Sequence, residues 1–313
     1  MKRITVLIKL FFTCGLLLIL IGVFFLRQDD IVTIINTYFY HNMENVTIGE
    51  RNEYYRDYNF TFVQNVEEVN PKSYQDLINI YYSIINSGQT SFSFYCPHEY
   101  KDCLTDVQKL ANNRELLSNI NNYVHPFNGF LHIETEYDTL GKVFIRIVKS
   151  YNSQQIKAIR EKVDTIFVSL YNQNASQVDN IRTFHDYIIN NAKYDSNRSD
   201  HGDTTYHSDI AYGPLFEGYA ICGGYTDLMA LFLEKMNIKN FKISSNDHIW
   251  NAVFLENQWY HLDLTWDDPV ASDGLDYLEY TYFLVDTKKL LLLENTQHNF
   301  NQDHYPELKE ANN

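Results

Sequence analysis

A thiol, an imidazole and a carboxylate that could perform nucleophilic chemistry follow one another in the last third of the chain. Cys222 lies in the segment Glu-Gly-Tyr-Ala-Ile-Cys-Gly-Gly-Tyr-Thr-Asp, His248 in Asp-His-Ile-Trp-Asn, and Asp263 in His-Leu-Asp-Leu-Thr-Trp-Asp-Asp. A base that takes the proton of a thiol, and a carboxylate that orients this base, together allow attack on an acyl group. These three residues are therefore the first candidates for a catalytic site.

The residues after Cys222 predict a helix that begins at or near it. Small residues lead into the cysteine, and Asn237 is suited to end the helix in a left-handed conformation. A helix N-terminus carries partial positive charge and free N–H groups, which stabilise a thiolate and can receive an oxyanion. The alternative is that Cys222 is a small buried residue without chemistry. The apolar positions at helical spacing are Tyr225, Leu228, Met229, Phe232, Leu233 and Met236.

His248 and Asp263 lie on two segments that predict an antiparallel hairpin. Residues 248–255 and 259–264 alternate between polar and apolar side chains, and the residues between them allow a tight turn at either of two positions. In both registers the position opposite His248 is odd-numbered, as is Asp263, so the two side chains share one face of the sheet. A bulge would break this relation, and a histidine and an aspartate on one face can also be mere surface decoration.

With these motifs the chain resembles the transglutaminase-like (papain-like) cysteine enzyme superfamily, in particular its short bacterial surface members. The resemblance is densest over 205–270 and, with flanking elements, covers 150–295. It implies an α+β fold in which a helix bearing the cysteine packs on a small antiparallel sheet bearing histidine and aspartate. It also implies that Cys222 is the nucleophile, that His248 is the base and later the acid, and that Asp263 orients the imidazole.

Four further positions are candidates for an oxyanion site or an acyl pocket. The chain has Gly223-Gly224 where many relatives have Gln-Gly after the cysteine, so a side-chain contribution there is in question. Backbone N–H groups near Cys222 remain possible oxyanion donors. Aromatic core packing is the alternative role for the two tryptophans. The candidates are Tyr212, Gly223, Trp250 and Trp266.

The N-terminus predicts a membrane anchor over residues 1–28. An uncharged run extends from Leu10 to Leu26, at the lower edge of the roughly 17–25 residues that cross a bilayer. Basic residues precede this run and Asp29-Asp30 follow it, so the rest of the chain is expected outside the cell. We thus expect a single-pass cell-membrane protein with an extracytoplasmic C-terminal domain. Secretion after cleavage of a signal peptide is the alternative.

The rest of the chain divides into three parts. Residues 29–150 predict an extracytoplasmic α/β region, 151–295 the catalytic core, and 296–313 a C-terminal tail. Within the α/β region we expect a strand over 54–66, a helix that starts at Asn70-Pro71, and one helix over 105–122. Two strands, 130–137 and 142–148, flank a turn.

Cys96 and Cys103 enclose six residues, which suits a small disulfide loop, and an extracellular location would preserve such a bridge. Two free thiols, or a zinc site that includes His98, are the alternatives.

Composition excludes one class of partner. The net charge of −15 and the lack of a basic stripe argue against nucleic-acid binding. The acidic segment 195–209 lacks the glycine of a calcium loop and is expected to be solvated. The sequence indicates no cofactor and no metal.

The leading function is that of a cysteine enzyme that forms a thioester with an amide or peptide bond of a protein or peptide at the cell surface or cell wall. Hydrolysis, as by a peptidase or amidase, is slightly favoured over acyl transfer to an amine. The first alternative is a surface module without catalytic activity that has a binding or a structural role. The second is metal-dependent hydrolysis by His201 and His207.

Overall fold

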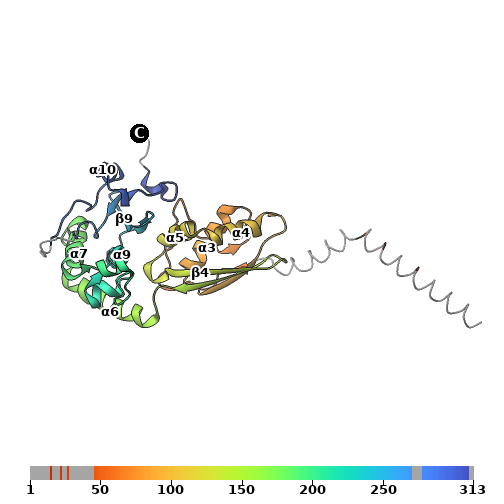
Figure 1. Cartoon of the computed structure of the whole chain (residues 1–313), viewed down its shortest axis with the longest axis horizontal. Coiled ribbons are helices and arrows are strands. Elements are labelled where there is room, and N and C mark those ends of the chain that lie inside the picture. Colours follow the sequence, from red (N-terminus) through yellow and green to blue (C-terminus); the bar gives the residue numbers. More distant parts are fainter. Residues whose placement is uncertain (1–14, 16–21, 23–26, 28–45, 270–276, 310–313) are drawn as a thin grey trace, which may run out of the picture. The chain divides into compact units, whose positions relative to one another are not determined.

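The computed structural model describes residues 15, 22, 27, 46–269 and 277–309 (Figure 1). The chain divides after residue 46, and the described residues from 47 onward form one larger compact unit. The predicted membrane anchor, residues 1–28, lies outside the described residues apart from three single positions. Among the described residues, no helix is long and apolar enough to cross a membrane.

The first part of the larger unit is a three-stranded antiparallel sheet with helices on one face (Figure 1). Its strand order is β3-β5-β4, and β5 is paired on both edges. Val143, Ile145 and Ile147 of β5 alternate into the core, while Leu131 of β4 is exposed. The strands are β3 (Ser91–Tyr95), β4 (Phe130–Tyr137) and β5 (Lys142–Lys149), and the helices are α3 (Tyr74–Asn86), α4 (Cys103–Asn112) and α5 (Arg114–Asn122).

Three predictions for this part were wrong. The helix expected to start at Asn70-Pro71 begins at Tyr74, because Ser73 is its N-cap and accepts from the N–H of Asp76. Residues 54–66 contain no strand, because polar side chains of α3 hydrogen-bond their backbone: Asn86 Oδ1 accepts from the N–H of Arg56 and Ser83 Oγ from that of Val66. The single helix over 105–122 is two helices, since Asn113 leaves the helical conformation and its side chain caps α5. The two strands around the turn at Gly141 are present as β4 and β5.

Cys96 and Cys103 are joined in a disulfide that ties the end of β3 to the start of α4, with Cα atoms 5.7 Å apart. We expect the double variant Cys96→Ala/Cys103→Ala to lose about 2–3 kcal/mol of unfolding free energy, because a short closed loop no longer restricts the unfolded chain. Urea denaturation measures this loss. An unchanged midpoint would show that the bridge does not stabilise the fold.

The second part packs helices around a second antiparallel sheet, of order β10-β9-β8. The helix that starts at Cys222 is buried from Gly224 to Leu233, as expected of a helix covered on all sides rather than on one. Phe232 of this helix stacks on Phe184 at 4.4 Å between ring centroids. The elements are α6 (Ser153–Leu170), α7 (Gln177–Asn191), α9 (Cys222–Lys235), β8 (Asn240–Ser244), β9 (Ile249–Leu255) and β10 (Gln258–Leu262).

Arg56 links the first part of the unit to the second. Its fully buried guanidinium bonds Glu234 near the end of α9, Asn240 Oδ1 on β8 and the carbonyl of Tyr123. The ring of Tyr123 also stacks on Phe241 of β8 at 4.9 Å. The α/β region therefore helps to hold the helix and the sheet on which the candidate catalytic residues lie.

Short elements complete the larger unit. Asp195 caps α8 inside the segment that the sequence predicts as a loop, and its side chain accepts from the N–H of Arg198. The short elements are β1 (Val46–Thr47), β2 (Glu68–Val69), η1 (Pro126–Asn128), β6 (Lys193–Tyr194), α8 (Ser196–His201), the π-helix η2 (Gly213–Glu217), β7 (Tyr219–Ala220), α10 (Thr287–Leu292), η3 (Thr296–His298) and η4 (Pro306–Leu308).

Candidate active site

Cys222 is the first residue of α9, as the sequence predicts. The residue before it, Ile221, is extended and provides no side-chain cap. The first N–H groups of a helix have no partner within it, so those at Cys222 and Gly223 can face a ligand. The thiol is free and only partly buried. A nucleophile at this position combines access with the positive end of a helix.

The backbone beside the nucleophile explains the Gly223-Gly224 pair. A Cβ at Gly223 would lie 2.6 Å from the carbonyl oxygen of Asp209, and one at Gly224 would lie 2.3 Å from that of Ser208. Real Cβ contacts are not this short, so the segment 208–210 can approach the start of α9 only if both residues are glycine. The Gly223-Gly224 pair of this chain thus follows from close backbone packing.

The hairpin has the first of the two registers considered. Leu255 pairs with Gln258, and the turn residues Glu256 and Asn257 have φ of 49° and 64°, as a type I′ turn requires. His248 directly precedes β9 and Asp263 directly follows β10. Both side chains therefore lie at the same end of the hairpin.

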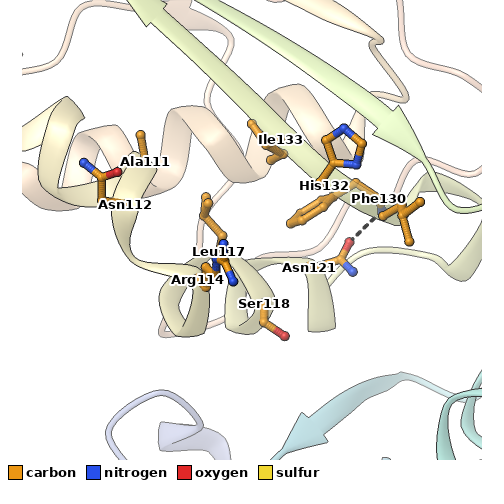
Figure 2. A pocket seen from close by; sticks show the side chains of 10 residues that line it. Ala111, Asn112, Arg114, Leu117, Ser118, Asn121, Phe130, His132 and Ile133 are labelled. Carbon is orange, nitrogen blue, oxygen red and sulfur yellow. Dashed lines mark hydrogen bonds between the residues drawn. The ribbon is translucent and has the colours of Figure 1, made fainter. Parts of the chain in front are cut away.

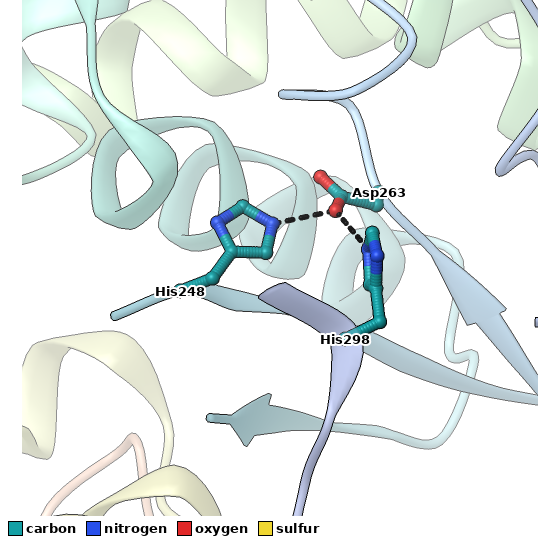
Figure 3. Close-up of side chains that lie close together, drawn as sticks. All are labelled: His248, Asp263 and His298. Carbon is teal, nitrogen blue, oxygen red and sulfur yellow. Dashed lines mark hydrogen bonds and ion pairs between the residues drawn. The ribbon is translucent and has the colours of Figure 1, made fainter. Parts of the chain in front are cut away.

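His248 and Asp263 are hydrogen-bonded, with 2.6 Å between His248 Nε2 and Asp263 Oδ2. Both side chains are almost fully buried. The other oxygen, Oδ1, accepts from the backbone N–H of Thr265 at 2.9 Å and from that of Trp266 at 3.4 Å. The carboxylate is thereby fixed at both oxygens, and its bond to Nε2 leaves Nδ1 as the free ring nitrogen of His248. Figure 3 shows this nitrogen on the side of the ring away from Asp263.

The charges of the site favour a protonated imidazole. Burial lowers the pKa of His248, but the charge of Asp263, the hydrogen bond to it, and the hydrogen bond and charge of Cys222 raise it to about 10. Burial raises the pKa of Asp263, yet the charge of His248 and the hydrogen bonds from His248 and His298 hold it below its ordinary value. Cys222 is thus one of the groups that act on the charge of His248, and a negative sulfur would stabilise the imidazolium.

A third side chain, His298, reaches the same carboxylate. Its Nε2 lies 2.8 Å from Asp263 Oδ2, and Figure 3 shows the two rings meeting at this one oxygen. The sequence predicts a tail over 296–313 and does not mark His298 as a candidate. A lone histidine in the segment Asn-Thr-Gln-His-Asn carries no local signal, because its partner is far away in the sequence. The structure alone brings it to the site.

The other candidate positions lie at different depths. Trp250 is fully buried, stacks on His248 at 5.6 Å, and donates Nε1–H to His261 Nδ1 at 2.9 Å. Trp266 is 39% exposed and donates to Gln297 Oε1. Trp250 thus packs against the ring of His248 in the interior, whereas the side chain of Trp266 is partly exposed to solvent.

Tyr212 and Gly223 lie on the segments that lead into the nucleophile. The ring of Tyr212 packs against Phe216 at 4.7 Å and against His207 at 5.3 Å. Gly223 follows Cys222 in the first turn of α9. Their roles in an oxyanion site or a pocket stay predictions.

His248, Asp263 and His298 also have the donor types of a metal site, and within the described part of the chain they are the one such group. His201 and His207 therefore belong to no metal-binding group there. The N–O separations of 2.6 and 2.8 Å are hydrogen-bond distances. Ligands about 2.0–2.1 Å from a tetrahedral zinc lie about 3.3 Å from one another. The arrangement fits two imidazoles that donate to a carboxylate better than three ligands around an ion.

A surface pocket of about 620 Å³ lies in the first part of the unit, between α5 and β4 (Figure 2). Arg114, Leu117, Phe130 and Ile133 are among its lining residues. None of the candidate catalytic residues lines it, so it is separate from the site at Cys222.

Comparison with known proteins gives two likenesses in structure. No protein-family model and no curated protein matches the sequence. A solved structure of a transglutaminase is similar at 13% identity and a TM-score of 0.32, over 49% of this chain and 48% of the other. A candidate cysteine protease from Cytophaga hutchinsonii is similar at 13% identity and a TM-score of 0.28, over 47% of this chain and 65% of the other. The chain thus spans less than two thirds of either protein.

The chain resembles the transglutaminase-like cysteine enzymes. The likeness consists of the order of Cys222, His248 and Asp263 in the sequence and of the residues around them. Its described residues form a mixed α/β fold with small antiparallel sheets.

Proposed function

We propose that the chain is a cysteine enzyme that cleaves amide bonds through a thioester on Cys222. The observations that support this most are the hydrogen bond from His248 Nε2 to buried Asp263 and the free thiol of Cys222 at the first position of α9. A fixed carboxylate, an oriented imidazole and a thiol at a helix start are the parts that such a reaction needs.

In the first half of the proposed reaction, Nδ1 of His248 takes the proton of Cys222, and the sulfur attacks the carbonyl carbon of an amide. The oxyanion that forms can be stabilised by the N–H groups at the start of α9. His248 then returns the proton to the amide nitrogen as the C–N bond breaks. An amine or ammonia leaves, and the acyl group stays on Cys222 as a thioester.

In the second half, water or an amine attacks the thioester and regenerates the thiol. Water gives a carboxylic acid and an amine gives a new amide. We favour hydrolysis of a protein or peptide at the cell surface or cell wall, with residues 1–28 as the membrane anchor. The acidic chain suits a neutral or cationic substrate better than nucleic acid.

The experiment uses the full-length chain with Cys14→Ser, so that Cys222 is the one thiol outside the Cys96–Cys103 bridge. It is incubated with β-casein as a probe substrate, with and without a biotinylated alkylamine. Ammonia without biotin indicates hydrolysis of glutamine side chains, biotin on casein indicates acyl transfer, and new amino termini indicate peptide cleavage.

Mass spectrometry of the intact chain then looks for an acyl adduct that hydroxylamine removes, as it removes a thioester. The proposal predicts this adduct on Cys222. The absence of all products, together with ordinary reactivity of Cys222 toward iodoacetamide, would overturn it and favour a silent surface module.

A further inference from the structure

Two imidazoles share one oxygen of Asp263, although the proposed reaction uses only one of them. His248 Nε2 and His298 Nε2 lie 2.6 and 2.8 Å from Oδ2. His248 faces the nucleophile, whereas His298 meets the carboxylate from the C-terminal segment (Figure 3). The proposed reaction gives no role to the ring of His298.

His298 is held rigidly from several sides. Its ring stacks on Tyr282 at 4.6 Å with an interplanar angle of 18°, and meets Trp250 edge-on at 4.9 Å. The ring is 1% exposed. The short helix η3 that carries it is capped by Asn295, whose side chain accepts from the N–H of Gln297. A side chain fixed in this way presents its Nε2 to Asp263 in one orientation.

The surroundings of His298 also determine its tautomer. Nδ1 is buried and has no hydrogen-bond partner among the described residues. Nε2 must carry a proton in order to donate to the carboxylate. A second proton on Nδ1 would be an unpaired, charged donor in the interior, which is costly. His298 is therefore a neutral ring that donates through Nε2–H, while His248 is the ring that exchanges its proton.

We propose that His298 is a positioning residue. It fixes the orientation of Asp263 and weakens the attraction of this carboxylate for the proton of His248. The inference rests on the proposed cysteine-enzyme function. By donating to Oδ2, His298 withdraws charge from the oxygen that His248 also contacts. His248 then gives its Nδ1 proton more readily to the nitrogen that leaves as the thioester forms. Without His298, Asp263 would attract that proton more strongly.

The other titratable groups that face this cluster lie on α9, on β10 and in the chain that follows β10. Cys222 on α9 faces His248. His261 on β10 is kept neutral, because burial lowers its pKa to about 3. Asp267, after β10, is hydrogen-bonded to His185, and the hydroxyl of Tyr282 accepts from Asn295.

The test follows the ring signals of the histidines by NMR as the pH changes, in the full-length chain and four variants. His298→Phe keeps an aromatic ring between Tyr282 and Trp250 but lacks the donor. His298→Gln retains an N–H that can reach Oδ2. His304→Phe is the matched control, since His304 in the same segment bonds Asn119 rather than Asp263. His248→Gln assigns the signals.

We expect the titration midpoint of His248 to rise by about half a pH unit in His298→Phe, since a carboxylate with one donor fewer attracts the proton more strongly. It should return toward its original position in His298→Gln and stay unchanged in His304→Phe. In the unaltered chain the nitrogen shifts of His298 should show a neutral ring protonated at Nε2.

Two results would overturn the inference. One is an unshifted His248 midpoint in a folded His298→Phe chain, and the other is a doubly protonated His298 ring, which needs no variant to be observed. The proposed function fails separately, when Cys222 of the unaltered chain reacts with iodoacetamide like an ordinary thiol. If Cys222 is activated and only the midpoint fails to move, then the role of His298 alone is wrong.

Discussion

Replacing Cys222 by alanine is expected to abolish amide cleavage and acyl transfer, with a loss in kcat of about 10⁵- to 10⁶-fold. The sulfur is the atom that forms the thioester in the proposed reaction, and no other described cysteine is free to replace it. The fold should survive, because the side chain is only partly buried. The measurement is ammonia or amine release from β-casein, compared with the unaltered chain at equal concentration.

Cys222→Ser distinguishes the loss of the nucleophile from the loss of side-chain volume at this position. Serine matches the size of cysteine but is a much weaker nucleophile without a stronger base, so it should be almost as inactive as alanine. Melting temperatures within a few degrees of the unaltered chain would exclude unfolding as the cause. Residual activity above about 10% in either variant would mean that the reaction does not pass through Cys222.

Asp263→Asn is expected to lower kcat by about 10⁴-fold while the chain remains folded. In the unaltered chain, the carboxylate of Asp263 accepts hydrogen bonds from Nε2 of His248 and Nε2 of His298. In the variant, the amide of asparagine can turn its NH₂ group toward these nitrogens. His248 would then carry its proton on Nδ1, the nitrogen that must take the proton of Cys222. Steady-state kinetics with β-casein should show the loss in kcat and little change in KM.

The matched control for this variant is Asp267→Asn. His185 Nε2 lies 3.2 Å from Asp267 Oδ2, so the described residues include a second buried histidine–aspartate pair, whose aspartate lies near Asp263 in the sequence. That pair lacks a thiol partner, and breaking it should cost stability without a loss of 10⁴-fold in kcat. Equal losses in the two variants would mean that Asp263 acts through the fold and not through His248.

The parts of the site that the sequence predicts are those encoded locally. The helix after Cys222 follows from apolar residues at helical spacing, and the hairpin follows from alternation on both sides of Glu256-Asn257. Because side chains alternate along a strand, parity alone places His248 and Asp263 on one face. Their hydrogen bond of 2.6 Å is consistent with that argument.

The parts that the sequence does not predict depend on contacts between distant segments. His298 contributes only because the last segment folds back onto Asp263, and nothing near it in the sequence indicates this partner. Residues 54–66 have strand composition, but side chains of α3 take their backbone hydrogen bonds. The close approach of 208–210 to Gly223 and Gly224 is likewise a tertiary feature. The intrinsic propensity of a short segment does not reveal its contacts with distant segments.

The central claim is that His248 activates the sulfur of Cys222, and the rate of iodoacetamide alkylation against pH tests it most directly. Because the pKa of His248 is raised to about 10, its ring stays protonated below that value and stabilises a negative sulfur. This stabilisation is lost as the pH rises through 10. Alkylation of the Cys14→Ser chain should therefore reach half its maximal rate well below pH 8.5, the midpoint of an ordinary thiol. In His248→Gln the midpoint should return to about 8.5, whereas identical profiles for the two chains would contradict the account.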